Sequence, residues 1–220
     1  MIFAESKRKV SEAAAAEIVA AVRPMFGRPA EDGGDDDEED WFRYHAAQSA
    51  RAPKPLLVGV FQNQPASRVA SIARRLRLDL IQLHGDEEPE FVRLLPAPCI
   101  KAFSVDAGAA PDAAASAEFA RARQPGHHAH VLLDAHAGPG GAKGGGGVLF
   151  DPGLAARFSA SGVPFILAGG LTPATVGAAV AAARPWAVDV SSGVETDGEK
   201  DPEKIREFVR AAKAACPRRC

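Results

Sequence analysis

The sequence predicts an α/β fold, a (β/α)8 TIM barrel truncated at its N-terminus to seven βα units. Apolar strand-like runs alternate with helical patterns along almost the whole chain, which indicates parallel βαβ units. These runs are continuously apolar, as expected of strands buried on both faces. The last two runs, within Phe165–Leu171 and Ala187–Glu195, each break into a short glycine-containing loop. Loops that offer bare backbone N–H groups at neighbouring strand ends suit a phosphate, and barrels often bind phosphate after strands seven and eight.

Seven runs are expected to form strands. They are Met1–Ala4, Pro55–Val60, Leu78–Leu83, Cys99–Phe103, Ala129–Asp134, Val163–Ala168 and Ala187–Ser191. A parallel α/β barrel closes with eight strands, and the first run begins at Met1 itself. We therefore expect the first βα unit to be the missing one, and the sequence to be a fragment of a longer chain.

The predicted helices between these runs share a capping pattern at their N-termini. Asp151, Thr172 and Asp201 each stand before a proline, so a capping side chain precedes a residue suited to the first helical turn. Apolar residues then recur at helical spacing, which predicts packing against the sheet. These stripes are Ile18 with Val22; Val69 with Ile72 and Leu76; Phe91 with Leu94 and Leu95; Val176 with Val180; and Ile205 with Phe208, Val209 and Ala212.

At 220 residues the chain fits one domain, 1–220, interrupted by an acidic surface insertion at about 27–54. The acidic run Glu31–Asp40 is expected to be disordered because its own charge keeps it solvated. The aromatic residues that follow it, from Trp41 to Tyr44, are expected to dock locally as a short helix.

Composition excludes several classes of function. The formal net charge of −2 gives no electrostatic reason to expect nucleic acid or an anionic membrane as a partner. No segment approaches the roughly 18 apolar residues of a membrane span, and no signal peptide is visible, so a cytoplasmic protein is expected. Cys99, Cys216 and Cys220 have spacings that fit neither a zinc site nor a disulfide framework, and no metal is expected.

Asp134 is a candidate catalytic residue. It ends the run AHVLLD, and a carboxylate at the end of a barrel strand is well placed for general acid or base work. A loop-capping aspartate fits the position equally well. The glycine-rich loop after it, Gly138–Gly147, matches neither a P-loop nor a dinucleotide fingerprint.

Histidine and arginine side chains near other strand ends leave alternatives open. His84 follows the run LIQL, and its side chain either lines the active-site end of the barrel or packs locally. Arg8 lies just after the first run and could face an anionic substrate. Four histidines gather around the run that ends at Asp134, and a solvated loop explains them more simply than a metal does. They are His127, His128, His130 and His136.

Several segments together resemble the phosphoribosylanthranilate isomerases. They are MIFA with Arg8-Lys9-Val10-Ser11, LLVGVFQNQP at 56–65, LDLIQLHGDE at 78–87, VLLD ending at Asp134, ILAGGLTPATV at 166–176 and VDVSSGVETDGEKD at 188–201. Their order and spacing hold over almost the whole chain. The insertion before LLVGVFQNQP resembles the fungal forms, in which this domain closes a multifunctional tryptophan-pathway polypeptide.

The resemblance implies an Amadori rearrangement of N-(5-phosphoribosyl)anthranilate, a phosphorylated small molecule, without metal or organic cofactor. It implies Asp134 as the general acid, Arg8 as the receiver of the anthranilate carboxylate, and a phosphate site at two loops. Those loops hold Gly169, Gly170, Ser191, Ser192 and Gly193. The family's general base is a cysteine in a Lys-Ile-Cys-Gly type motif on the first strand, and the sequence contains no such motif.

Two alternatives follow from the missing motif. One is a non-catalytic module that binds phosphorylated ligands or a partner protein. The other is a different phosphate-binding barrel such as an indole-glycerol-phosphate synthase, for which Lys101 in CIKAF would supply a strand-end lysine. The rest of that second pattern is absent.

Overall fold

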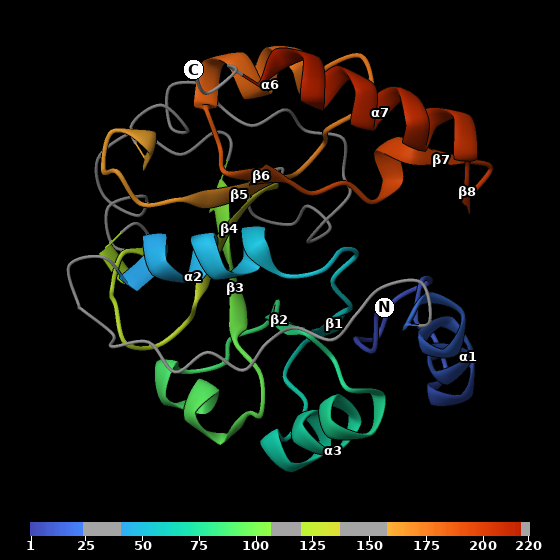
Figure 1. Cartoon of the computed structure of the whole chain (residues 1–220), viewed down its shortest axis with the longest axis vertical. Coiled ribbons are helices and arrows are strands. Elements are labelled where there is room, and N and C mark those ends of the chain that lie inside the picture. Colours follow the sequence, from blue (N-terminus) through green and yellow to red (C-terminus); the bar gives the residue numbers. More distant parts are fainter. Residues whose placement is uncertain (24–40, 107–119, 137–157, 217–220) are drawn as a thin grey trace. The chain divides into compact units, whose positions relative to one another are not determined.

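The computed structural model describes residues 1–23, 41–106, 120–136 and 158–216 (Figure 1). Their contacts divide the chain into two compact units. Unit 1 comprises Met1–Ala102 with Gln124–His130, and unit 2 comprises Phe103–Arg123 with Val131–Cys220. Six strands follow one another in the sheet in sequence order, β1 to β6, as expected for successive βα units.

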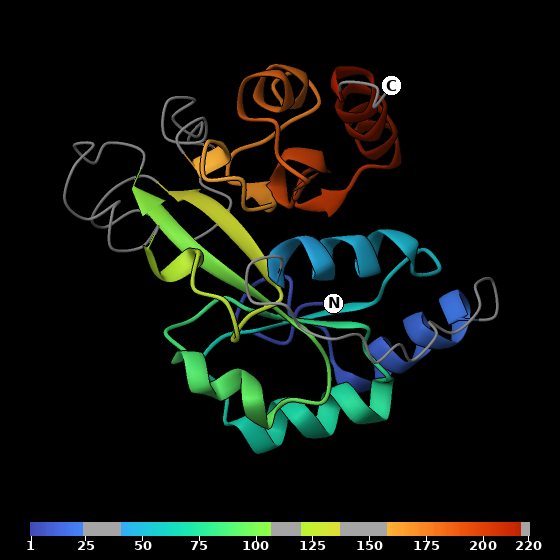
Figure 2. The same ribbon diagram turned by 60° about the vertical axis from the view of Figure 1, so that its left-hand side comes forward.

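Unit 1 holds the amino-terminal elements. These are α1 (Glu12–Val22), α2 (Trp41–Arg51), β1 (Val58–Phe61), α3 (Ala66–Leu76), β2 (Leu80–Leu83), the 3₁₀ helix η3 (Pro89–Leu94) and the first half of β3 (Cys99–Asp106). The strands β1, β2 and β3 pair in parallel. Within this unit, α3 and η3 lie on one face of the strands and α2 lies on the other (Figures 1 and 2).

The core of unit 1 explains why its helices form where they do. The α3 stripe Val69, Ile72 and Leu76 is buried, as its spacing predicts, and packs in one cluster with Ile81 and Leu83 of β2. The Phe3 ring stacks on Phe61 of β1 with ring centroids 5.1 Å apart. Ser11 caps α1 by accepting a hydrogen bond from the Ala14 N–H at 3.1 Å.

The run Met1–Ala4 forms less of a strand than its sequence predicts. Ile2 makes single parallel bridges to Val60 and to Lys9, and Phe3 donates its N–H to the Val60 carbonyl at 2.8 Å. The chain then turns within residues 4–8, so the ladder beside β1 stops after one bridge. The run therefore lies next to β1 in an extended form without becoming a full strand.

Unit 2 holds most of β4 (His130–His136), β5 (Phe165–Ala168), α6 (Val176–Ala183), β6 (Ala187–Val188) and the 3₁₀ turn η4 (Ser192–Val194). A short antiparallel hairpin, β7 (Glu195–Thr196) with β8 (Glu199–Lys200), leads into α7 (Pro202–Ala215). The strands β4, β5 and β6 pair in parallel. Helices α6 and α7 lie side by side in both views (Figures 1 and 2).

Of the predicted helix starts, the structure confirms Asp201 and contradicts Thr172. Asp201 caps α7 as predicted, because its carboxylate accepts hydrogen bonds from the N–H groups of Glu203 and Lys204 at 2.9 and 3.3 Å. Thr172 does not cap α6. Its carbonyl accepts from Thr175 and Val176 in a turn, and the helix begins only at Val176. The third predicted start, Asp151, lies outside the described residues.

Three predicted apolar stripes are wrong about burial. In α1, Ile18 is 39% exposed, and of the predicted pair only Val22 packs against the core of unit 1. Leu94 is 62% exposed because its segment forms a short 3₁₀ helix, whose periodicity differs from that of an α-helix. In α7, Phe208 is buried as predicted, but Ile205 and Val209 are exposed. The face of α7 that meets α6 carries Ala211 and Ala215, which lie beside Gly177.

Only the second part of the predicted insertion lies within the described residues. Its acidic run Glu31–Asp40 lies outside them. The aromatic part forms α2, which confirms the expected short helix, and the side chain of Phe42 is buried.

Candidate active site

The loop after β5 turns sharply at two glycines. Gly169 and Gly170 adopt φ values of 93° and 61°, a left-handed conformation that glycine reaches without steric cost. The β5 strand is buried throughout, and this loop leaves it at Ala168. Two successive left-handed residues let the backbone turn sharply at the end of β5. Because both residues are glycines, this edge of unit 2 presents main-chain groups rather than side chains.

The loop after β6 presses against the loop after β5. A Cβ atom built on Gly193 would lie 1.8 Å from the Leu171 carbonyl oxygen, so only glycine fits where the two backbones meet. The second loop is also held from its other side. Lys200 Nζ donates to the Ser191 carbonyl and pairs with the Glu195 carboxylate, each at 2.7 Å. Ser191, Ser192 and Gly193 thus form a fixed turn against Gly169–Leu171.

Asp134 belongs to the same edge of unit 2. It lies in β4, directly opposite Ala168, the last residue of β5. Its residue is only 5% exposed, and β4 continues beyond the predicted end to His136. The buried carboxyl group of Asp134 thus lies level with the end of the strand that leads into the glycine loop.

Arg8 lies in unit 1, in the turn that follows the Met1–Ala4 run. Its backbone N–H donates to the Ser6 hydroxyl at 3.2 Å, which fixes the turn, and its residue is half-buried. The backbone that carries the Arg8 guanidinium group is therefore ordered and lies next to β1.

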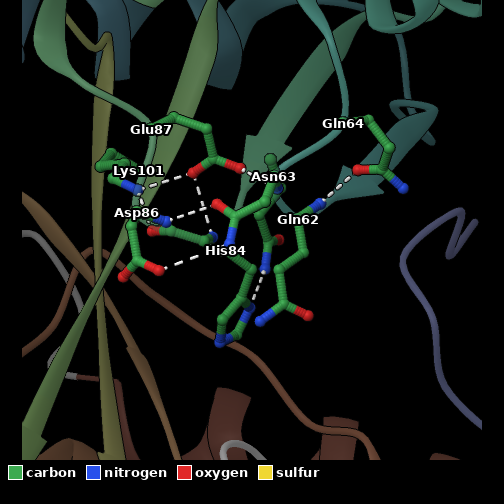
Figure 3. A network of polar contacts seen from close by, with 9 residues as sticks. Gln62, Asn63, Gln64, His84, Asp86, Glu87 and Lys101 are labelled. Atoms are coloured by element: carbon green, nitrogen blue, oxygen red, sulfur yellow. Dashed lines mark hydrogen bonds and ion pairs between the residues drawn. The ribbon is translucent and has the colours of Figure 1, made fainter.

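A buried ion pair that sequence reasoning missed joins the segment after β2 to β3 in unit 1 (Figure 3). Lys101 Nζ lies 2.8 Å from Glu87 Oε2, and the two side chains are 14% and 3% exposed. Lys101 Nζ also donates to the Gly85 carbonyl at 2.5 Å. The sequence does show an acidic segment, GDEE, after one predicted strand and a lysine within the next strand. However, no local sequence pattern indicates that Glu87 and Lys101 form an ion pair.

The Glu87 carboxylate also receives backbone donors from two loops. It accepts from the Asn63 N–H at 2.8 Å and from the Gly85 N–H at 3.0 Å. Burial alone would raise the pKa of Glu87, but the hydrogen bond and charge of Lys101 and the Asn63 N–H outweigh burial and hold that pKa below its ordinary value. The carboxylate therefore stays ionised at neutral pH.

His84 extends away from the Glu87–Lys101 pair, as does Gln62 (Figure 3). Its ring Nδ1 lies 3.3 Å from the Gln82 amide nitrogen, and its residue is half-buried. His84 stands directly after β2, at the carboxyl end of the strand. The structure therefore places it at a strand end, as the sequence suggests, on the side where barrel enzymes carry their chemistry.

The expectation of a solvated histidine loop is wrong for His128 and His130, which are only 5% and 4% exposed. Helix α2 covers them: Trp41 Nε1 donates to the His128 carbonyl at 2.8 Å, and Ser49 Oγ lies 2.9 Å from His130 Nε2. Burial first, and then the charges of His45, His128 and Lys54, lower the pKa of His130 to about 4. His130 is thus a neutral core residue.

Neither described cysteine lies at the carboxyl end of a strand. Cys99 begins β3 and is buried in the core of unit 1. Burial, with a smaller effect of the Glu87 charge, raises the pKa of its thiol to about 12, so it is not a thiolate base at neutral pH. Cys216 follows α7 and is exposed, and Cys220 lies outside the described residues.

Within residues 1–23, 41–106, 120–136 and 158–216, no group of three or more His, Cys, Asp or Glu side chains is arranged to hold a metal ion. No helix in this part of the chain is both long and apolar enough to cross a membrane.

A parallel βα sheet in sequence order, with a carboxylate and glycine loops at its strand ends, defines a protein of the TIM-barrel class. The family model described as N-(5'phosphoribosyl)anthranilate (PRA) isomerase matches residues 16–211. The chain belongs to this family.

Individual relatives agree with the family match. A multifunctional tryptophan biosynthesis protein of Phycomyces blakesleeanus is 42% identical over 97% of this chain, which spans 29% of that protein. An N-(5'-phosphoribosyl)anthranilate isomerase of a Roseiflexus species is 40% identical over 98% of this chain and 86% of its own length. This chain thus spans less than a third of the multifunctional relative and most of the bacterial one.

Solved structures show the same fold. A phosphoribosyl anthranilate isomerase in complex with reduced 1-(o-carboxyphenylamino)-1-deoxyribulose 5-phosphate has a TM-score of 0.68 and 26% sequence identity, covering 97% of this chain and 86% of that one. The isomerase from Thermotoga maritima has a TM-score of 0.71 and 28% identity over the same shares of the two chains.

Proposed function

We propose that this chain isomerises N-(5'-phosphoribosyl)anthranilate to 1-(2-carboxyphenylamino)-1-deoxyribulose 5-phosphate in tryptophan biosynthesis. The observation that carries the proposal is the family match over residues 16–211, in a chain whose strand ends carry Asp134 and the glycine loops. The multifunctional relatives support a place for the chain within a larger tryptophan-pathway polypeptide.

The proposed chemistry begins at Asp134. Its carboxylic acid donates a proton to the furanose ring oxygen as the bond from that oxygen to C1 breaks, which leaves a Schiff base. A base then removes the proton from C2, and the resulting enolamine tautomerises to the ketone. Arg8 receives the anthranilate carboxylate, and the loops with Gly169, Gly170 and Ser191–Gly193 hold the phosphate through backbone N–H groups.

The positions of the described cysteines bear on the rate that we propose. A positioned general base contributes roughly 10²–10⁴-fold to a proton transfer, and neither described cysteine stands at the carboxyl end of a strand. We therefore propose slow turnover with intact ligand binding. We also propose that residues 1–220 belong to one domain with an insertion at about 27–54, since the relatives align with 97–98% of the chain.

The test compares the wild-type chain with Asp134→Asn. We expect both proteins to bind the reduced product analogue with similar Kd, measured by the fluorescence of its anthranilate ring. We expect turnover of the substrate by the wild type only, with a loss of at least about 10²-fold in the variant. Equal turnover by the two proteins refutes the role of Asp134. Analogue binding by a wild type without any turnover refutes the isomerase proposal and favours a non-catalytic binding module.

A further inference from the structure

Gln62 stands directly after β1, on the face of the strand that is turned away from α3. The side chain of Phe61, the last residue of β1, is fully buried in the core cluster with Val69 and Ile72 of α3. Because successive side chains of a strand point to opposite faces, Gln62 points to the other face of β1. Its residue is half-buried, and its side chain extends away from the Glu87–Lys101 pair (Figure 3). Gln62 therefore presents its amide at the carboxyl end of the strand, where barrel enzymes carry their chemistry.

The amide of Gln62 has donors that are not used within unit 1. The Gln62 backbone N–H donates to Gln64 Oε1 at 2.6 Å (Figure 3). Among the residues that the structure describes, the Gln62 side chain takes part in no hydrogen bond. A primary amide carries two N–H donors and a carbonyl acceptor. A half-buried amide with unused donors at a strand end is suited to an acceptor group of a ligand.

Gln64 ties the loop that holds Gln62 to the segment that leads to Arg8. Its Oε1 accepts the Gln62 N–H, and its Nε2 donates to the Phe3 carbonyl at 2.9 Å. Phe3 belongs to the run Met1–Ala4, which lies beside β1 and continues into the turn that carries Arg8. One side chain thus fixes the end of β1 against the start of this turn.

Arg8 and Gln62 follow neighbouring parallel segments. Ile2 makes its parallel bridge to Val60, two residues before Gln62, so both chains leave at the same edge of unit 1. Neighbouring strands lie about 4.8 Å apart, which lets side chains from the two loops reach one small anionic group. A carboxylate that binds a guanidinium group through both oxygens keeps lone pairs for a further donor.

We propose that the side-chain amide of Gln62 donates to the anthranilate carboxylate of the substrate beside Arg8, and that Gln64 is a positioning residue that holds Gln62 there. The proposal rests on the function proposed above, in which Arg8 receives this carboxylate. Gln62 is then a specificity-determining residue, because its donor distinguishes an anthranilate ring from an aromatic amine without a carboxylate.

The test compares two ligands that differ only in the carboxylate. One is the reduced product analogue, and the other carries an aniline ring in place of the anthranilate ring. Titration calorimetry should show that Gln62→Leu weakens binding of the first ligand about 10-fold and of the second less than about 2-fold, because a hydrogen bond to a charged group is lost only with the first. Gln62→Glu, of nearly the same size, should weaken the first ligand further because two carboxylates repel each other.

The positioning role of Gln64 predicts coupling rather than addition. Gln64→Met removes both hydrogen bonds of its amide and keeps a side chain of similar length. We expect it to weaken the reduced product analogue about 5-fold when Gln62 is present and less than about 2-fold in the Gln62→Leu background. Equal losses in the two backgrounds would overturn the positioning role.

Gln48 supplies the matched control. It is a half-buried glutamine of α2, the helix that covers His128 and His130 at the amino end of β4. Gln48→Leu should leave the Kd of both ligands unchanged.

The two ligands also separate the ways in which the reasoning can fail. Equal losses for both ligands in the Gln62 variants, or no loss for either, would overturn the contact with the carboxylate. A wild-type chain that binds neither ligand would contradict the proposed function instead, so the two failures are distinguishable.

Discussion

Substituting Gly193 by alanine tests the contact between the two glycine loops. The new Cβ would lie 1.8 Å from the Leu171 carbonyl oxygen and 2.9 Å from its carbon. Backbone cannot yield as a flexible side chain does, so the loops must part by about 1.2 Å to reach the 3.0 Å below which real Cβ contacts essentially never occur. Overpacking of this kind costs about 1–3 kcal/mol of stability.

Ligand affinity should fall as well. A displacement of that size exceeds the spread of N–H···O distances in hydrogen bonds, about 2.7–3.2 Å, so we expect the loss of at least one backbone donor to the proposed phosphate. A hydrogen bond to a charged group is worth about 1.5–3 kcal/mol, which corresponds to roughly 10- to 100-fold in Kd. Titration calorimetry with the reduced product analogue measures this loss, and an analogue without the phosphate should bind wild type and variant equally.

Gly177→Ala provides the matched control for this substitution. The nearest atoms to its added Cβ lie 3.9 Å away, in ordinary contact, and alanine is favoured over glycine inside a helix such as α6 by up to about 1 kcal/mol. We expect unchanged affinity and equal or higher stability. Wild-type affinity and wild-type stability in the Gly193 variant would refute the close approach of the two loops.

Two further predictions concern titration and loop support. His130 has a pKa of about 4 when folded and about 6.5 when unfolded, so the unfolded chain binds more protons between these values and stability falls as pH drops through this window. Urea unfolding should show a wild-type loss of roughly 2 to 3 kcal/mol between pH 7 and pH 4.5 that His130→Gln lacks, and parallel pH curves would contradict it. Lys200→Met removes the tether to the Ser191 carbonyl, a hydrogen bond worth about 1 kcal/mol, so the Kd of the reduced analogue should rise about five-fold. The melting temperature of the Lys200→Met variant should change little because the ion pair with Glu195 is partly exposed. An unaltered Kd would mean that the hydrogen bond from Lys200 does not position the loop.

The parts of the fold that sequence could predict are those governed by local spacing. Strands buried on both faces read as continuous apolar runs, which is why FILA is found almost where it was expected. The α3 stripe is a clear 3.6-residue repeat, and Asp201-Pro202 is a local capping signal. Asp134 and the glycine loops were found for the same reason, because they follow such runs directly.

What sequence could not predict depends on partners far along the chain. His128 and His130 looked solvated because the helix that buries them, α2, comes from residues 41–51. The stripe of α7 was misread because Phe208 fits two helical faces, and only the position of α6 selects between them. Likewise, Lys101 and Glu87 each stand near a strand end in the sequence, but their pairing is a property of the strand register.

The Glu87 carboxylate also bears on how this part of the molecule opens. Its acceptors are shared between the loops after β1 and β2, and its charge is matched by a side chain from β3. Fraying of either loop, or loss of the contact with β3, would leave a buried charge with fewer partners, so neither loop can loosen without cost to the other. We therefore expect the carboxyl ends of β1 and β2 to open together, because the loops that follow them share this carboxylate and its pairing with Lys101 of β3.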